Sequence, residues 1–130
     1  MLTRRTFAAV LVAALAMPTL AVAQATTPSA AQYAKIENIA DALQRILRRD
    51  PGARVLIEGH TDAVGSFQSN QILSEQRAAS LKRTLLREFG VPGYALETVG
   101  YGEEFLLVQT QNENWRNRRV TLCRFDDFIR

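Results

Sequence analysis

The stretch IEGHTDAVG, Ile57 to Gly65, decides the fold of this chain because it leads a strand into a polar loop ahead of a helix. Residues 54–60 predict a strand, whose centre is apolar and whose run ends at Gly59. Residues 61–70 predict a polar loop. In open α/β folds, ligands bind in the crevice beyond such strand ends. The stretch therefore predicts both a strand–loop–helix unit and the position of its site.

Helical patterns lie on both sides of this stretch. Residues 31–49 carry apolar side chains at helical spacing, and Asp50-Pro51-Gly52 ends the pattern. A second helix is predicted over about 74–89, with Ser74 as its N-cap and Gly90 at its end. Its buried stripe is expected to comprise Ala78, Leu81, Leu85 and Leu86.

Two further strands are predicted, over 96–100 and 119–125, and a long polar connection over 103–116 separates them. The order is helix, strand, helix, strand, strand. This order predicts a two-layer α/β sandwich, in which a small mixed sheet carries the helices on one face.

The N-terminus reads as a secretory signal peptide over residues 1–23. Arg4 and Arg5 form a basic start, the apolar stretch that follows is shorter than the roughly 20 residues of a spanning helix, and small residues end it. Cleavage after Ala23 and cleavage after Ala25 both fit the pattern, as do the general and the twin-arginine export routes. No transmembrane segment is expected once the signal is removed.

The mature chain is expected to hold a flexible leader over 24–31 and one domain over 32–130. The single cysteine and single histidine of the 130 residues exclude a disulfide framework and a multi-histidine metal site. Removing Arg4 and Arg5 from the 16 basic residues leaves 14 against 13 acidic ones, which does not favour a nucleic-acid partner. No cofactor is expected, because the sequence holds no Gly-rich phosphate loop.

Enzymatic readings have little support in the sequence. No G-x-S-x-G motif accompanies the serines, and His60 as a general base would need a nucleophile and an orienting acid. Glu103-Glu104 is better explained as a solvated turn than as a catalytic pair. The basic cluster Arg116, Arg118 and Arg119 fits either an anion site or a set of structural arginines.

Asp62 and Arg77 are the charged pair of the predicted crevice. Arg77 falls in the predicted first turn of the second helix, where an arginine opposes the helix dipole, so it is not placed for helix stability. Its guanidinium can donate two parallel hydrogen bonds to a carboxylate, and Asp62 can accept from an ammonium. Spacing alone leaves two interpretations open: a pocket for a zwitterionic amino-acid head group, or a direct Asp62–Arg77 salt bridge.

Four ordered motifs carry a family resemblance. They are Ile57-Glu58-Gly59-His60-Thr61-Asp62 with Val64-Gly65, Asn70 with Leu73-Ser74 and Arg77-Ala78, Gly100-Tyr101-Gly102-Glu103, and Asn117-Arg118-Arg119-Val120. Over about residues 34–125, this set resembles the signature of OmpA-like peptidoglycan-binding domains. The resemblance implies an α/β sandwich that binds peptidoglycan without catalysis, in the periplasm, and contributes to envelope integrity.

The resemblance also implies roles for individual residues. Asp62 matches the family's ligand for the ammonium of diaminopimelate in the stem peptide, and Arg77 matches the ligand for its carboxylate. Thr61, Asn70 and Arg118 fall near the same pocket by the same match. On this basis ligand binding is favoured over a direct Asp62–Arg77 salt bridge.

The chain departs from the family pattern in two places. Family domains begin with a strand ahead of the first helix, and no such strand is found between the predicted signal and residue 31. The missing strand predicts an open sheet edge, so the alternative function is an interaction module that accepts a strand from an envelope protein. Phe105-Leu106-Leu107 stands where polar residues are usual, and it predicts either an exposed apolar patch or a packed lid.

Overall fold

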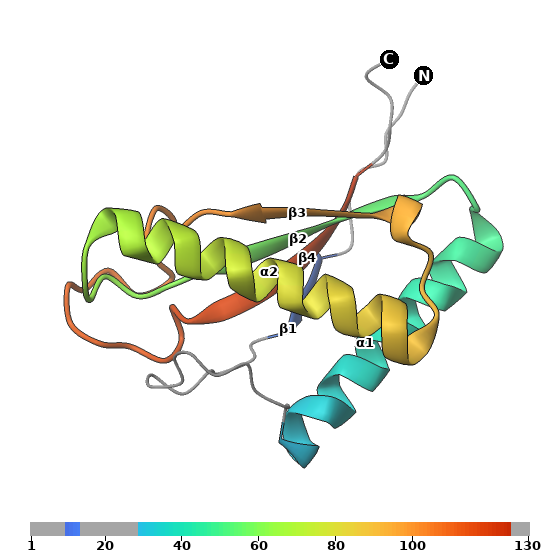
Figure 1. Cartoon of the computed structure of the whole chain (residues 1–130), viewed down its shortest axis with the longest axis horizontal. Coiled ribbons are helices and arrows are strands. Elements are labelled where there is room, and N and C mark those ends of the chain that lie inside the picture. The colour runs from blue at the N-terminus through green and yellow to red at the C-terminus, as the bar shows by residue number, and fades with distance from the viewer. Residues whose placement is uncertain (1–9, 14–28, 126–130) are drawn as a thin grey trace.

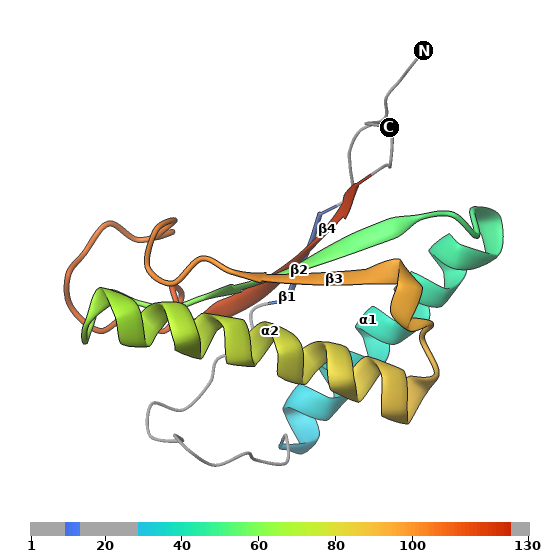
Figure 2. The ribbon, with the colours of Figure 1, turned by 45° about the horizontal axis from the view of Figure 1, so that its top comes forward.

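The computed structural model describes residues 10–13 and 29–125, which form two layers (Figure 1). The elements in chain order are β1 (Val10–Ala13), α1 (Ala30–Arg49), β2 (Arg54–His60), α2 (Phe67–Phe89), a short 3-10 helix η1 (Gly93–Ala95), β3 (Leu96–Gly100) and β4 (Arg119–Phe125). Both helices lie on one side of the sheet when the molecule is turned (Figure 2). The predicted two-layer α/β sandwich is confirmed.

The sheet has the strand order β1-β4-β2-β3 and is mixed. Its two central strands, β2 and β4, are antiparallel, with Ile57 opposite Leu122. β3 runs parallel to β2 and reaches its register through the α2 crossover, with Val55 opposite Leu96. Because β2 and β3 are parallel, their carboxyl ends lie together at one end of the sheet, which is where ligand sites form in such folds.

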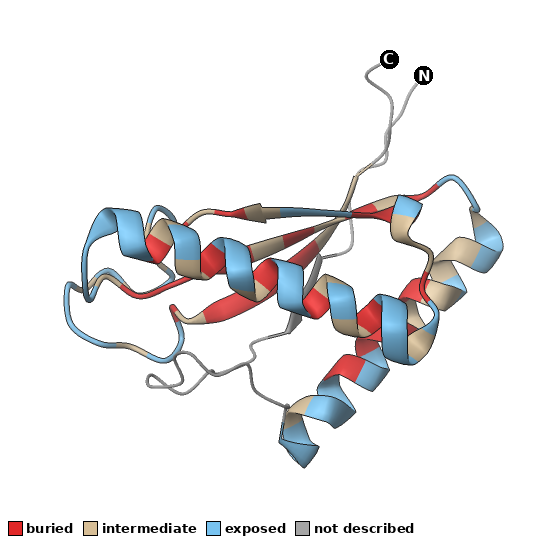
Figure 3. Ribbon diagram, viewed as in Figure 1, coloured by how far each residue is buried: buried red, intermediate tan, exposed pale blue. Residues whose placement is uncertain are grey.

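The core lies between the sheet and the helices (Figure 3). Alternate residues of the central strands enter it, as expected for strands with one covered face. The core residues are Ile36, Ile39, Ala40 and Leu43 of α1, Ala78, Leu81 and Leu85 of α2, Val55 and Ile57 of β2, Leu96 of β3, Val120 and Leu122 of β4, and Val91. Leu86, which was predicted to belong to this stripe, is 36% exposed.

The predicted start of the second helix is wrong. α2 begins at Phe67 and is capped by Ser66, whose hydroxyl accepts the backbone N–H of Ser69 at 3.0 Å. Ser74 is fully buried inside the helix, and its hydroxyl accepts the N–H of Gly102 at 2.8 Å. In the first turns of α2 the apolar Phe67 and Ile72 are exposed and the polar Asn70 is buried, so the apolar periodicity does not reveal the helix there. The predicted cap was therefore Ser74 and not Ser66. Arg77 consequently lies well inside the helix, and the argument from the helix dipole does not apply to it.

The β4 edge differs from the prediction as well. It is covered by β1, an antiparallel strand in which Val10 lies opposite Cys123 and Ala13 opposite Val120. These four residues belong to the apolar part of the predicted signal peptide, and their extended backbone offers N–H and C=O groups that can pair with an edge strand. The open edge is therefore expected only for a chain that has lost residues 1–23. The two predicted cleavage positions and most of the 24–31 leader lie outside the described residues.

None of the helices in the described part of the chain has the length and apolar character needed to cross a membrane.

Candidate functional site

The candidate site lies at the joined ends of β2 and β3. The backbone N–H of Thr61 donates to the carbonyl of Gly102 at 2.8 Å, and the N–H of Tyr101 donates to the carbonyl of Gly59 at 3.0 Å. These two bonds continue the parallel pairing past the strand ends. They hold the start of the loop after β2 against the turn after β3, so the backbone that leads into Asp62, the residue after Thr61, is fixed.

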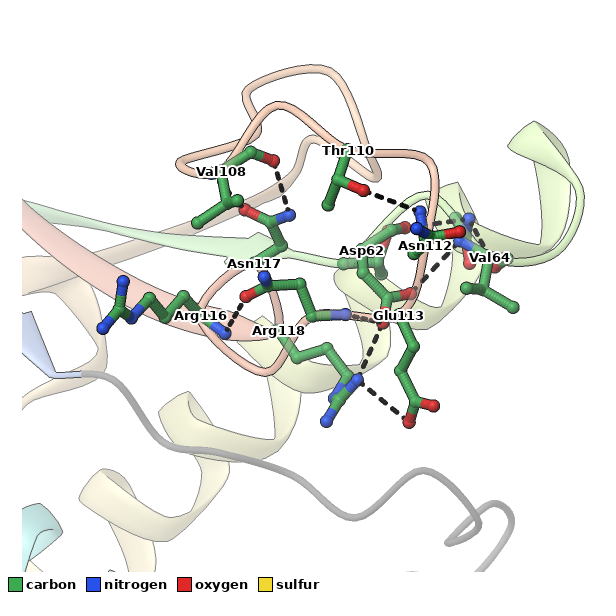
Figure 4. Close-up of polar contacts among 12 residues, drawn as sticks. Asp62, Val64, Val108, Thr110, Asn112, Glu113, Arg116, Asn117 and Arg118 are labelled. Carbon is green, nitrogen blue, oxygen red and sulfur yellow. Dashed lines mark hydrogen bonds and ion pairs between the residues drawn. The ribbon is translucent and has the colours of Figure 1, made fainter.

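Asp62 is only 6% exposed. Its carboxylate accepts three hydrogen bonds (Figure 4). Its Oδ1 accepts the N–H of Val64 at 3.3 Å, and its Oδ2 accepts the N–H of Asn114 at 3.3 Å. The third donor is Nη1 of Arg118, 2.7 Å from Oδ2. The carboxylate is thus held in one orientation by its own loop and by the distant 103–118 segment.

Arg118 joins two acidic side chains. Its Nη1 also lies 3.3 Å from Glu113 Oε2, and 14% of its side chain is exposed, against 59% for Glu113. The pair with Asp62 is the buried one, since the Asp62 side chain is 9% exposed. Breaking a buried charge pair leaves an uncompensated charge, so this contact fixes the segment around Arg118 against the loop after β2.

Arg77 comes to the same region from α2. Its Nη1 donates to the carbonyl of His60 at 3.3 Å, and the side chain is half-buried. Burial lowers the pKa of the Arg77 guanidinium, the positive charge of Arg118 lowers it further, and the charge of Asp62 partly opposes both effects. Between the two described residues Asp62 and Arg77 the structure forms no ion pair. The direct salt bridge left open by the spacing is thus replaced by the pair of Asp62 with Arg118.

Thr61 and Asn70 shape the loop from inside. They are 2% and 4% exposed. The Thr61 hydroxyl donates to the carbonyl of Asp62 at 2.9 Å. The Asn70 amide donates to the carbonyls of Asp62 and Val64 and to Glu103 Oε1, at 3.2, 3.0 and 2.8 Å. Both residues lie at the predicted place, and their polar groups are engaged in holding the backbone that presents Asp62.

Asn117 is a further site-building residue. The resemblance placed it near the pocket as part of the Asn117-Arg118-Arg119 segment, without a role of its own. Its side chain is fully buried. Figure 4 shows its amide against Val108. The Asn117 Oδ1 accepts the N–H groups of Leu107 and Val108 at 2.7 and 2.9 Å, and its Nδ2 donates to the Val108 carbonyl at 3.0 Å. The Asn117 amide therefore joins the backbone just before β4 to that of Leu107 and Val108, in the middle of the long connection before β4. Its place at the start of the Asn117-Arg118-Arg119-Val120 motif was the available signal.

Asn117→Ala is expected to lower the free energy of unfolding by about 2 kcal/mol, because it removes a fully buried amide and the three hydrogen bonds that it makes to partly buried backbone groups. Urea denaturation measures the change. The control is Asn112→Ala, since the Asn112 side chain is exposed and lies in the same connection. Equal stability of Asn117→Ala and the wild type would contradict this role.

His60 does not form a catalytic arrangement in the described structure. Its ring is 3% exposed, neither ring nitrogen has a hydrogen-bond partner among the described residues, and the Glu58 carboxylate is 3.9 Å away. Burial, together with the nearby charge of Arg119, lowers the pKa of His60 to about 4. His60 is therefore a buried neutral ring, packed against Tyr101 with centroids 5.5 Å apart.

The arginine cluster divides into separate roles. Arg119 is 5% exposed and donates to the carbonyl of Phe105 at 2.9 Å, which is a structural contact. Arg118 holds Asp62, and Arg116 lies over the ring of Trp115. Phe105 is 56% exposed, so the apolar segment 105–107 is a surface patch and not a packed lid.

The chemistry of the site is that of a carboxylate flanked by two guanidinium groups. Such a set can accept from an ammonium and donate to a carboxylate of one zwitterionic group. Within residues 10–13 and 29–125, no three His, Cys, Asp or Glu side chains gather where they could hold a metal ion.

Known protein sequences resemble this chain over most of its length. A family model described as OmpA family matches residues 23–119. Over 90 residues the chain is 40% identical to outer membrane porin F of Pseudomonas aeruginosa, covering 68% of this chain and 25% of the porin. Over 73 residues it is 42% identical to the peptidoglycan-associated lipoprotein of the same organism, covering 55% of this chain and 43% of the lipoprotein. The chain thus spans less than half the length of these curated relatives.

Solved structures share the fold. The periplasmic domain of Helicobacter pylori MotB superposes with a TM-score of 0.66 at 21% identity, covering 78% of this chain and 66% of that domain. The peptidoglycan-associated lipoprotein of Burkholderia pseudomallei superposes with a TM-score of 0.63 at 26% identity, covering 76% of this chain and 81% of that protein.

Proposed function

This chain belongs to the OmpA family, and on that premise we propose that it is a non-enzymatic module that binds peptidoglycan in the bacterial periplasm. The family match covers the whole strand–loop–helix unit that carries the site. Two of the similar proteins are named for their association with peptidoglycan. In this function the chain contributes to the integrity of the cell envelope.

The ligand group we propose is diaminopimelate in the stem peptide. Its side-chain end carries both an ammonium and a carboxylate, which matches a carboxylate beside two guanidinium groups. The ammonium is assigned to Asp62, and the carboxylate to Arg77. The observation that carries this assignment is the buried, hydrogen-bonded Asp62 beside Arg118 and Arg77 at the strand ends. Asp62 Oδ1 accepts one hydrogen bond from the protein, so lone-pair capacity remains for a ligand.

The proposed location requires export. We propose that residues 1–23 are a signal peptide that directs the chain to the periplasm, where the outer membrane and the wall are both within reach. The basic start, short apolar stretch and small-residue end support this assignment.

Co-sedimentation with isolated peptidoglycan sacculi tests the function. The chain without residues 1–23 is expected to pellet with sacculi, and free diaminopimelate is expected to compete. Asp62→Asn and Arg77→Ala should each weaken pelleting at least about tenfold, because each removes a charge-assisted contact. The matched controls are Asp41→Asn and Arg83→Ala, which change exposed helical residues of the same types. Urea denaturation confirms that each variant is folded.

Unchanged pelleting of both folded site variants would overturn the diaminopimelate assignment. A folded wild-type chain that does not pellet would overturn peptidoglycan binding itself. One observation supports a second candidate in that case: the β4 edge takes up an antiparallel strand, as its pairing with β1 demonstrates. The alternative function is then an interaction module that accepts a strand from an envelope protein.

A further inference from the structure

Trp115 is exposed on a backbone that is firmly held. Its side chain is 52% exposed. Its carbonyl accepts the N–H of Arg118 at 3.1 Å, and the N–H of Arg116 donates to Asn114 Oδ1 at 2.9 Å. These bonds form a tight turn. An aromatic ring carried on such a turn loses little conformational freedom on binding, so it is a favourable contact residue.

The turn places Trp115 at the edge of the proposed pocket. The residue before it, Asn114, donates its N–H to Asp62 at 3.3 Å, and Arg118 three residues later binds the same carboxylate at 2.7 Å. Neighbouring Cα atoms are about 3.8 Å apart. The backbone of Trp115 is therefore only one residue along the chain from Asn114, which contacts the Asp62 carboxylate that is assigned to the ligand ammonium.

The surroundings of Trp115 have the composition of a binding surface. The Arg116 guanidinium lies over its ring, 5.5 Å from the centroid. Phe105 and Leu107, on the same connection, are 56% and 60% exposed. Asn117 ties this part of the connection to the turn, through the N–H of Leu107 at 2.7 Å. Exposed apolar groups beside a few fixed polar groups are typical of ligand sites.

We propose that Trp115 is a stacking platform for a sugar ring of the glycan strand, with Arg116 as a polar contact at its side. This inference rests on the proposed function and extends it from the stem peptide to the glycan. The C–H face of a pyranose is apolar and weakly positive, which suits the negative face of an indole ring. The hydroxyl and acetamido groups at the sugar's edge can accept from a guanidinium.

The reach of the ligand agrees with this assignment. The stem peptide is covalently joined to the glycan, and about three extended residues span about 10 Å. A diaminopimelate group seated at Asp62 therefore keeps its sugar within a short distance of the pocket edge. The backbone of Trp115 and Arg116 lies at that edge, and the Arg116 side chain extends from it on the side away from Asp62 (Figure 4).

The sole tryptophan of the chain makes the proposal directly measurable. Peptide-free glycan strands, released from sacculi by amidase digestion, are expected to shift the Trp115 emission to shorter wavelength. Free diaminopimelate alone is expected to leave the emission unchanged. Trp115→Ala should weaken the binding of intact sacculi about tenfold, the effect typical of a central aromatic contact, and should leave the Kd for an isolated diaminopimelate stem peptide unchanged.

Two variants serve as references. Trp115→Tyr keeps an aromatic face and should restore most of the sacculus binding. Tyr94→Ala removes an aromatic residue that is 63% exposed on η1, at the opposite end of the sheet, and should have no effect (Figure 1).

Each contrary outcome is distinct. Wild-type affinity of Trp115→Ala for sacculi, or an emission that peptide-free glycan does not change, would overturn the platform. An equal loss of stem-peptide binding in Trp115→Ala would also overturn it, since the residue would then act through the pocket. Failure of the wild-type chain to pellet would contradict the proposed function, whereas the glycan titration would still decide the role of Trp115.

Discussion

Gly59→Ala should prevent stable folding, with a loss of more than about 4 kcal/mol in the free energy of unfolding, the range reached only by severe overpacking. A Cβ built at Gly59 lies 2.0 Å from the backbone oxygen of Ser74 and 2.9 Å from its carbonyl carbon. No side chain can rotate to relieve this contact, because both atoms belong to the backbone of α2. Accommodation would require the helix to move away from the sheet. Urea denaturation and near-ultraviolet circular dichroism measure the loss.

Gly52→Ala is the matched control. The added Cβ would lie 3.7 Å from Asp50 Oδ1, which is an ordinary van der Waals distance, and the backbone of Gly52 is not left-handed. Its free energy of unfolding should stay within about 0.5 kcal/mol of the wild type. Gly59→Ala with similar stability would show that α2 is not packed directly on β2 at Ser74.

Acid should destabilise the chain through His60. The pKa of His60 is about 4 in the folded chain because of burial and the charge of Arg119, against an ordinary value of 6.5. Between these values the unfolded chain binds a proton that the folded chain does not. The His60 contribution to stability is therefore complete above pH 6.5, falls as the pH falls toward 4, and is lost below it. The pKa difference corresponds to about 3 kcal/mol.

The comparison of wild type with His60→Phe isolates this contribution. Phenylalanine keeps a ring beside Tyr101 but does not titrate in this range. Urea denaturation at pH 7.5 and pH 4.0 should show a drop in stability for the wild type that exceeds the drop for His60→Phe by about 3 kcal/mol. Contributions from groups that His60→Phe leaves unchanged cancel in the difference. Equal drops would mean that His60 is protonated as readily in the folded chain as in the unfolded one.

The strands were predictable because their signals are local. The runs 54–60, 96–100 and 119–125 are confirmed at both ends by the structure. Each is a short run rich in apolar residues, and Gly or polar residues flank it. The first helix was predicted one residue short, since Ser29 caps it through a hydrogen bond to Gln32.

The second helix shows where local signals fail. Ser66 and Ser74 are both good N-cap residues, and the apolar periodicity becomes clear only after Ser74. What distinguishes them is tertiary: Ser74 is buried against the turn after β3, where it receives the N–H of Gly102. That contact joins residues 28 positions apart, and no helical pattern encodes it.

The sequence predicted which candidate residues would lie together but not how they would pair. Asp62, Arg77 and Arg118 do meet at the end of the sheet, as the motif set implied. The partner of Asp62 is Arg118, 56 positions away, and not Arg77. Charge and spacing cannot rank two candidate arginines for one carboxylate, because the ranking depends on how the 103–118 segment folds back. Asn117 holds that segment through hydrogen bonds to the backbone of Leu107 and Val108, and only the structure shows these bonds.

The pairing of β1 with β4 sets two processes in competition. Val10–Ala13 form an edge strand in the folded chain, and they are also the middle of the proposed export signal. The segment Val10–Ala13 cannot be hydrogen-bonded to β4 and enter a translocation channel at the same time. In a precursor that folds early, Val10–Ala13 would be paired with β4 and could not be recognised as a signal. The proposed export therefore favours a chain that reaches the membrane before β4 has formed. In a chain cleaved at the proposed site, the backbone groups of Val120 to Cys123 on that side lose their β1 partners and become exposed to water. Such a molecule would carry an unpaired strand edge that can hydrogen-bond to a strand of another chain.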